Sequence, residues 1–277
     1  MWIAIIPAYN EAKHIQTVLQ NLIPCNFKLV ILVANGCNDQ TEEYALQASK
    51  KLNLEILSFP EPLGLDIPRA IGAAHAKKYH PQGIVFIDGD MNGKITPSVF
   101  SLLQGLKKGL DLALTNCYPS PCYPSPSQLS DLAANVLKFR EIVNKKLGVF
   151  PKIGCASPSH GPHALSARLL SQIPIKALAI PPLTLAYASQ NHLQVGVAAS
   201  ISHKLLGSPQ RSPEHAQNIA DTIIGDCLQT LAYLEGASLD EILQSQSPPS
   251  SDSYSVYRKA RRFDVLESFL TPLPTTS

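Results

Sequence analysis

The feature of the sequence that most constrains the fold is a regular alternation of apolar runs and helical patterns over the first hundred residues. Each apolar run is short and ends in Pro, Gly, Asn or Asp, which is typical of buried parallel strands. The runs cover residues 2–6, 28–33, 54–59 and 84–87, and the helical patterns between them cover 10–22, 40–52 and 67–79. We expect Asn10 to cap the first helix. This order predicts an α/β fold in which helices cover both faces of a mostly parallel central sheet.

The rest of the chain contains longer helices and more loops. Two copies of Cys-Tyr-Pro-Ser-Pro, at 117–121 and 122–126, hold too much proline for a helix or an interior strand, so we expect a surface loop there. Ser212, Pro213 and Glu214 form a typical helix start. The expected elements are helices at 96–107, 128–147, 212–235 and 254–270, strands at 112–115 and 193–201, a loop at 148–163 and a linker at 244–253.

Composition and charge exclude several classes of protein. Lys and Arg exceed Asp and Glu by only two, 23 against 21, so the chain lacks the positive field that nonspecific nucleic-acid binding requires. The longest stretch without charge, 177–203, contains two prolines and a polar centre, which argues against a transmembrane helix. The N-terminal sequence does not follow the order of an export signal, and the six cysteines show no zinc spacing. We therefore expect a cytoplasmic protein with reduced thiols. Nothing in the sequence indicates an oligomeric state.

Two aspartates follow the fourth expected strand, where the sheet meets solvent. Asp88 and Asp90 flank Gly89, and their carboxylates would repel each other if unpaired. A divalent cation removes this repulsion, and hard oxygen ligands suit Mg²⁺ or Mn²⁺, which commonly also bind substrate phosphate. The alternative is a turn, in which Asp and Gly are both common. Ligands of such sheets bind beyond the carboxyl ends of the strands, so the loops there should face one crevice. These loops are 7–11, 34–39, 64–69 and 88–92.

Four segments of the first hundred residues together resemble the family 2 glycosyltransferases of the GT-A fold. They are Ile-Ile-Pro-Ala-Tyr-Asn-Glu at 5–11, Val-Ala-Asn-Gly-Cys-Asn-Asp-Gln-Thr at 33–41, Gly-Leu-Asp-Ile-Pro-Arg-Ala-Ile-Gly-Ala-Ala-His-Ala at 64–76, and Asp-Gly-Asp at 88–90. The resemblance implies a Rossmann-like three-layer fold, with a single domain at 1–245 followed by a linker and a basic helix at 246–277. Within the domain, 1–105 would bind a nucleotide-diphosphate sugar and 106–245 would bind the acceptor.

The resemblance also implies roles for individual residues. Asp88 and Asp90 look like the family's DxD pair, with Asp90 the stronger candidate for direct contact with Mg²⁺ or Mn²⁺. His203 resembles the histidine after a late strand that completes the metal site in some relatives. Ala34 and Asn35 replace the acidic pair often found there, which leaves the nucleobase open. The implied nucleotide-sugar-binding residues are Pro7, Ala8, Tyr9, Glu11, Asn35, Gly64, Arg69, Asp88 and Gly89, and the implied acceptor or diphosphate contacts are Gly161, His163, Lys204 and Arg211.

The implied reaction is the metal-dependent transfer of a sugar from a nucleotide diphosphate to an unidentified acceptor. A cation in the metal site would stabilise the charge that grows on the leaving diphosphate. An inverting enzyme also needs a carboxylate that deprotonates the acceptor hydroxyl, but residues 180–187, where such enzymes often carry one, contain none. Asp66, Glu214 and Asp226 are weak candidates for this base, and each also suits a cap or a surface charge. The stereochemistry and the base therefore stay open.

Other functions compete with this interpretation. A nucleotidyltransferase needs a Gly-rich basic loop after the first strand, and a dinucleotide oxidoreductase needs Gly-x-Gly-x-x-Gly there; residues 7–11 fit neither. A noncatalytic nucleotide-sugar-binding module that lost its base is consistent with the missing acid. The basic cluster of the last helix, Arg258, Lys259, Arg261 and Arg262, is expected to be a solvated face, with peripheral contact to anionic lipid or to a phosphorylated acceptor as the alternative.

Overall fold

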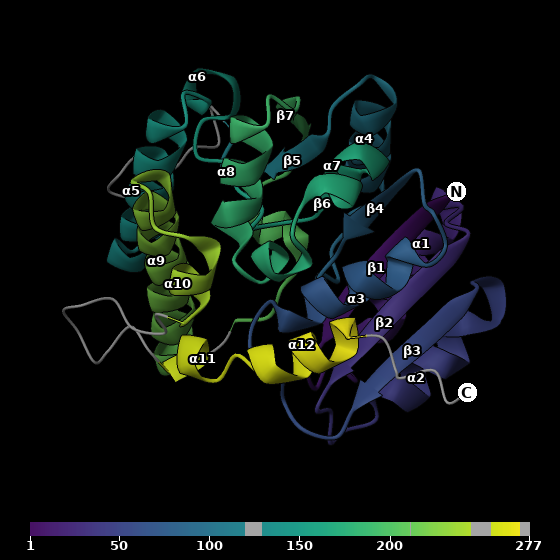
Figure 1. Ribbon diagram of the computed structural model, residues 1–277. Coiled ribbons are helices and arrows are strands. Elements are labelled where there is room, and N and C mark those ends of the chain that lie inside the picture. The colour runs from purple at the N-terminus through teal and green to yellow at the C-terminus, as the bar shows by residue number, and fades with distance from the viewer. Residues whose placement is uncertain (120–128, 211, 245–255, 272–277) are drawn as a thin grey trace, which may run out of the picture.

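The computed structural model describes residues 1–119, 129–210, 212–244 and 256–271, in which a seven-stranded sheet lies between helices on both of its faces (Figure 1). The strands are β1 (Trp2–Ala8), β2 (Leu29–Asn35), β3 (Leu54–Phe59), β4 (Gly83–Phe86), β5 (Leu112–Asn116), β6 (His163–Ser166) and β7 (Val195–Ser200). Their order across the sheet is β3-β2-β1-β4-β6-β5-β7. Strand β6 is antiparallel to β4 and β5, and the other neighbouring pairs are parallel. The predicted α/β class and the mostly parallel sheet are confirmed.

Alternate side chains of the central strands pack into the hydrophobic cores on opposite faces of the sheet, because successive side chains of a strand point to opposite faces. Ile3 and Ile5 of β1 pack in one core with α3, whereas Ala4 and Ile6 pack in the other with α1 and α4. The helices are α1 (Ile15–Leu22), α2 (Thr41–Ala48), α3 (Ile67–Lys77), α4 (Thr96–Lys107), α5 (Asp131–Lys146), α6 (Phe150–Ile153), α7 (Ala167–Gln172), α8 (Pro181–Gln190), α9 (Pro213–Leu234), α10 (Leu239–Gln244), α11 (Val256–Lys259) and α12 (Phe263–Leu270).

The first helix begins five residues later than expected, at Ile15, and Asn10 does not cap it. Asn10 adopts a left-handed backbone conformation with φ 56°, and its side-chain oxygen accepts a hydrogen bond from the Asn38 backbone N–H (2.9 Å). Asn10 therefore links the loop after β1 to the loop after β2. Ser212, in contrast, accepts a hydrogen bond from the His215 N–H and caps α9 as predicted. Most of the tandem Cys-Tyr-Pro-Ser-Pro segment and of the expected linker lies outside the described residues.

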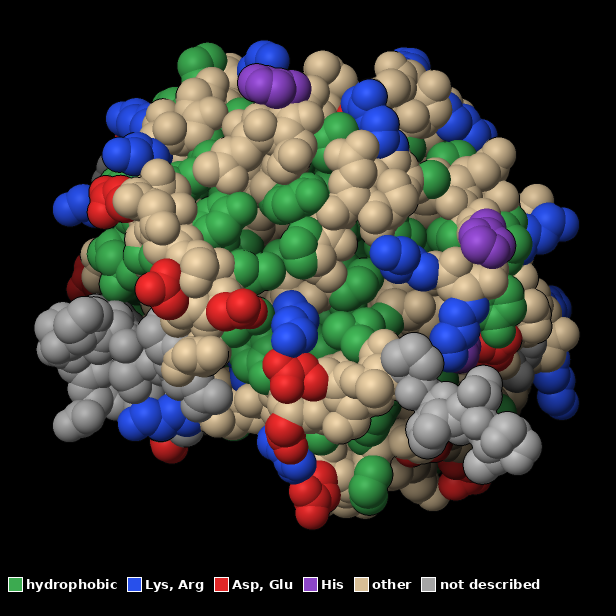
Figure 2. All heavy atoms as spheres, in the orientation of Figure 1, with side chains coloured by type: hydrophobic (Ala, Val, Ile, Leu, Met, Phe, Trp, Pro, Cys, Tyr) green, Lys and Arg blue, Asp and Glu red, His purple; other side chains and the backbone are tan. Residues whose placement is uncertain are grey.

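The single helix expected at 254–270 is wrong: this segment forms two short helices, α11 and α12, and α12 lies along α3 (Figure 1). Arg261 lies between the two helices, and its side chain is buried. The expectation of a solvated basic face is wrong for two of its four residues, since Arg258 and Arg261 are buried, at 2% and 4% exposure, whereas Lys259 is exposed and Arg262 is half-buried. Figure 2 shows that on this face of the molecule Lys and Arg side chains are interspersed with Asp and Glu. No helix in the described part of the chain combines the length and the hydropathy that crossing a bilayer demands.

Candidate functional site

The candidate site lies along the carboxyl edge of the sheet. Parallel strands end at the same edge, so the loops after β1, β2, β3, β4, β5 and β7 meet there, and the antiparallel β6 begins there. All four predicted crevice loops are among them. The strand ends approach closely: the Gly89 N–H donates to the Pro7 carbonyl (3.0 Å), and a Cβ at Gly89 would lie 3.0 Å from the Ala8 Cβ. Beside them Tyr9 is exposed and Glu11 is buried.

The loop that follows β3 is held from two sides. On one side, the Asn35 side chain accepts a hydrogen bond from the Leu63 N–H (2.6 Å) and donates one to the Gly64 carbonyl (3.4 Å). On the other, the Arg262 N–H donates to the Leu63 carbonyl (2.9 Å). Gly64 has φ +82°, and a Cβ there would lie only 2.5 Å from the Ala260 carbonyl oxygen. Asn35 therefore positions this loop, whatever it contributes to a nucleobase.

Replacement of Gly64 by Ala tests this contact. We expect it to lower the free energy of unfolding by about 2 kcal/mol or more, because left-handed strain of about 1 kcal/mol is added to a collision with backbone. Urea unfolding measures the loss. The matched control is Gly148→Ala, since Gly148 also has positive φ (+70°) but a Cβ there would meet nothing within 4 Å. Equal losses in the two variants would show that the contact with Ala260 does not matter.

Arg69 lies in the first turn of α3 and pairs with two acidic residues. Its guanidinium pairs with Asp66 through Nη1 and with Asp88 through Nη2 (2.5 Å), so both are held at the mouth of the crevice. Burial lowers the pKa of Arg69 but Asp88 and Asp66 raise it, and the net direction is upward. Burial raises the pKa of Asp66, and Arg69 opposes that shift. The structure thus brings together Arg69 and Asp88, two of the residues expected to bind the nucleotide-sugar.

The loop after β7 packs directly on the loop after β4. The Gly93 N–H donates to the Leu206 carbonyl (2.8 Å), and Gly207 (φ +79°) lies so close that a Cβ would be 2.3 Å from the Gly93 nitrogen. This contact brings Ser208 to Asp90, where its hydroxyl donates to Oδ1 (3.2 Å). His203 begins the same loop and lies near enough to Asp90 for the carboxylate to raise its pKa, although burial lowers that pKa by more. His203 and Asp90 thus lie on neighbouring loops of the crevice, and their joint binding of a metal ion stays a prediction.

A row of aromatic and basic side chains continues from His203 into the interior. Its ring stacks on Tyr118 (centroids 6.1 Å, planes 13° apart), and its Nδ1 lies 2.8 Å from Nε2 of His160. Nδ1 of His160 lies 3.4 Å from Nη1 of Arg140. A guanidinium can only donate, so Nδ1 of His160 accepts, its Nε2–H donates to His203 Nδ1, and a neutral His203 carries its proton on Nε2. In this arrangement His203 offers an N–H to the crevice.

The three expected metal ligands are not gathered into one cluster. Across residues 1–119, 129–210, 212–244 and 256–271, no three His, Cys, Asp or Glu side chains converge closely enough to hold a metal ion. Asp88 is paired with Arg69, Asp90 with Ser208, and Nδ1 of His203 with His160, which leaves the protonated Nε2 of a neutral His203 facing the crevice as a donor and not as a metal ligand. The two carboxylates nevertheless lie on one turn at the edge of the sheet. Hard oxygens in that position still fit Mg²⁺ or Mn²⁺, which usually take one or two protein carboxylates and complete their shell with water and substrate phosphate.

The residues expected on the acceptor side are placed differently from one another. Gly161 has φ +75°, and a Cβ there would lie 2.7 Å from Cys117 Sγ, so it allows close packing. His163 opens β6 and is buried against Phe86; burial lowers its pKa to about 3, and it is neutral at pH 7. Lys204 is exposed beside His203. Arg211 lies outside the described residues.

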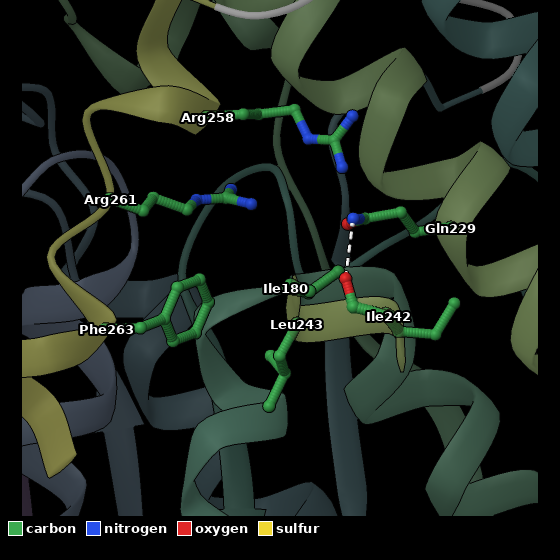
Figure 3. Close-up of a pocket in the computed structure, with 7 residues that line it drawn as sticks. All are labelled: Ile180, Gln229, Ile242, Leu243, Arg258, Arg261 and Phe263. Atoms are coloured by element: carbon green, nitrogen blue, oxygen red, sulfur yellow. Dashed lines mark hydrogen bonds between the residues drawn. The ribbon is translucent and has the colours of Figure 1, made fainter. Parts of the chain in front are cut away.

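Two of the three weak candidates for the base, Asp66 and Asp226, lie in a buried network of ion pairs. Asp226 accepts hydrogen bonds from Nη1 (2.7 Å) and Nη2 (2.8 Å) of Arg261, which also pairs with Asp66 (3.2 Å). Nε of Arg258 lies 3.6 Å from Oδ1 of Asp226. Figure 3 shows Arg258 and Arg261 extending from the C-terminal segment into a small pocket opposite Gln229 of α9. This arrangement gives both carboxylates a structural role. Glu214, the third candidate, is exposed in the first turn of α9.

Two parts of the site were not found in the sequence. Arg140 and His160 were not singled out, and the partners of Arg261 were not foreseen. For Arg140 a signal exists, because it lies on the buried stripe of α5 with Val136, Leu137 and Val143. An arginine at such a position is unusual. For Arg261 the signal is absent, since Asp226 and Asp66 are 35 and 195 residues away.

Comparison with known proteins identifies a family and similar solved structures. A family model described as Glycosyl transferase family 2 matches residues 3–159. Crystal structures of glucosyl-3-phosphoglycerate synthase from Mycobacterium tuberculosis are similar in fold. One, with Mn²⁺, UDP and glucosyl-3-phosphoglycerate, has a TM-score of 0.59 at 19% identity over 84% of this chain and 80% of that chain. Another, with Mn²⁺ and UDP-glucose, has a TM-score of 0.62 at 18% identity over 84% and 79%. No curated protein matches the chain.

Proposed function

The chain belongs to glycosyl transferase family 2, and on that premise we propose that it transfers a sugar from a nucleotide diphosphate to an acceptor hydroxyl at the carboxyl edge of the sheet, with the help of Mg²⁺ or Mn²⁺. The observation that carries the proposal is the position of Asp88 and Asp90. They follow β4 directly, and loops from both halves of the sheet converge on them. The related crystal structures, which contain UDP with Mn²⁺, support the same class of donor.

The residues around the two aspartates have distinct roles in this proposal. Asp88 and Asp90 hold the cation, which when bound neutralises charge on the leaving diphosphate. Arg69 orients the Asp88 carboxylate through an ion pair, and the Ser208 hydroxyl orients the Asp90 carboxylate through a hydrogen bond. His203 directs its Nε2–H at a phosphate oxygen. Each group is held by its neighbours before the donor arrives, which lowers the cost of reorganisation during the reaction.

A thermal-shift panel of UDP, GDP, ADP and CDP, each with Mn²⁺ or with EDTA, tests the donor class. A ligand at 100 times its dissociation constant adds about 2.7 kcal/mol to the free energy of unfolding. For a chain of this size that corresponds to a rise of several degrees in Tm. We expect such a rise with one nucleotide and only in Mn²⁺. An equal rise in EDTA would contradict the role of the metal, and no rise with any nucleotide would contradict the donor site.

Turnover distinguishes the transferase from a noncatalytic nucleotide-sugar-binding module. The module remains a second candidate because Asp66 and Asp226 are both committed to arginines. Release of nucleoside diphosphate from the sugar nucleotide that binds in the panel, measured with and without added acceptors, separates the two. Tight binding without release would favour the module.

A further inference from the structure

Arg140 is a buried cation on the acceptor half of the molecule. It lies on the inward face of α5 at 4% exposure, where α5 packs against α9. The groups whose charge would act on it are Cys117, Tyr118, Cys155 and Cys227, from three other segments of the chain. These groups are thiols and a phenol, and none of them is a carboxylate.

No carboxylate of the described residues pairs with Arg140. Its one hydrogen bond is the long contact with His160, and its Nε has no partner in the described part of the chain. Each of the other arginines in the described residues pairs with an aspartate: Arg69, Arg168, Arg258, Arg261 and Arg262. Burial raises the pKa of Cys117 and of Cys227 to about 12, so neither thiol is an anion at pH 7. Among the residues that the structure describes, the charge of Arg140 is thus left uncompensated.

An uncompensated buried guanidinium is unfavourable, because it cannot lose its proton and an isolated buried charge is expensive. A counter-anion that arrives with a substrate removes this penalty. The direction of approach is set by the contact with His160, which leads through His203 to the crevice. In the proposed function the donor diphosphate is neutralised by the cation of Asp88 and Asp90. Arg140 lies at the inner end of the row that His203 and His160 begin, so an anion that reaches it is a different group from that diphosphate.

We propose that Arg140, together with His160, binds an oxyanion carried by the acceptor, a phosphate or a carboxylate. The assignment to the acceptor depends on the proposed function, whereas the binding of an oxyanion does not. A bidentate contact between guanidinium and oxyanion fits both groups. The acceptor of this enzyme is then an anionic hydroxyl compound.

Inorganic phosphate in EDTA is the probe for the anion. We expect phosphate to raise the Tm of the wild type but not that of Arg140→Met, whose dissociation constant for phosphate should be at least tenfold higher. Arg258→Met is the control for loss of a buried arginine, and phosphate should raise its Tm as it does that of the wild type. Without phosphate, Arg140→Met should be at least as stable as the wild type, because an uncompensated charge is removed. Arg140→Lys, which keeps the charge but not the fork, should retain a weakened response.

Several outcomes would overturn the proposal. They are no phosphate response in the wild type, an unchanged response in Arg140→Met, or an Arg140→Met variant that is less stable without phosphate. UDP with Mn²⁺ separates the two sources of the anion: equal UDP affinity in wild type and Arg140→Met supports the acceptor, and a loss assigns Arg140 to the diphosphate instead. A phosphate response without any nucleotide response would reject the proposed function and leave the anion site in place.

Discussion

Replacement of Arg261 by methionine should lower the free energy of unfolding by about 3 to 5 kcal/mol. Arg261 bridges the two buried carboxylates of Asp226 and Asp66, and its Nε–H donates to the Leu65 carbonyl (2.9 Å). Methionine fills a similar volume but leaves both carboxylates with fewer counter-charges. Removal of one partner of a buried ion pair typically lowers the free energy of unfolding by about 3 to 5 kcal/mol. Urea unfolding at pH 7 measures the effect.

Arg262→Met is the matched control for that variant. Arg262 is the next residue, and its ion pairs with Asp264 and Glu61 are exposed to solvent, so we expect a change below about 1 kcal/mol. The double variant Arg261→Met/Asp226→Asn should be less destabilised than the sum of the single variants, because it also removes one of the stranded charges. Similar losses for Arg261→Met and Arg262→Met would contradict the buried network.

The deficit of Arg261→Met should depend on pH. Burial raises the pKa of Asp66 in the wild type, and Arg261 counteracts this. Without Arg261 the folded-state pKa of Asp66 rises further above the value of the unfolded chain. The folded variant then takes up a proton at higher pH than the unfolded chain does, so acidification stabilises it relative to the wild type. The difference between the two should therefore shrink as the pH falls through the raised pKa of Asp66.

The parts of the molecule that were predicted well depend on local patterns. The strands of the first hundred residues were placed to within two residues of the observed ends, because a buried strand flanked by turn residues is a signal contained in a few neighbours. The crevice followed from topology alone. Ser212 was recognised as a cap for the same reason, since capping depends on residues three apart.

The errors come from contacts between distant segments. Asparagine is a common helix cap, but the side chain of Asn10 accepts a hydrogen bond from the loop at 36–40 instead. Arg258 and Arg261 belong to a run of basic residues that suggests a solvated face. Their burial depends on Asp226 and Asp66, whose positions only the folded chain shows. The same limit applies to His203: its position near Asp90 was predicted, but its hydrogen bond to His160 was not.

Asp90→Asn should abolish the stabilisation of the protein by nucleotide in Mn²⁺ and lower kcat/KM by about 100-fold or more. The asparagine keeps the shape and can still accept the hydrogen bond that the Ser208 hydroxyl donates, but it removes the negative charge that a hard divalent cation requires. Loss of an electrostatic group that acts on the leaving diphosphate typically costs this much in rate. Calorimetric titration with the nucleotide found in the thermal-shift panel, in Mn²⁺ and in EDTA, measures the binding.

Asp221→Asn is the control for Asp90→Asn. Asp221 is also partly exposed and also accepts a side-chain hydrogen bond, from Gln217 within α9, but it is not at the carboxyl edge of the sheet. It should bind and turn over donor like the wild type. In Asp90→Asn, the nucleotide affinity in Mn²⁺ should fall to the value that the wild type shows in EDTA, because the variant no longer holds the cation. The affinity that remains would come from Arg69 and from the loops after β1 and β2. An Asp90→Asn variant whose affinity still depends on Mn²⁺ as in the wild type would place the cation elsewhere and remove Asp90 from the proposed reaction.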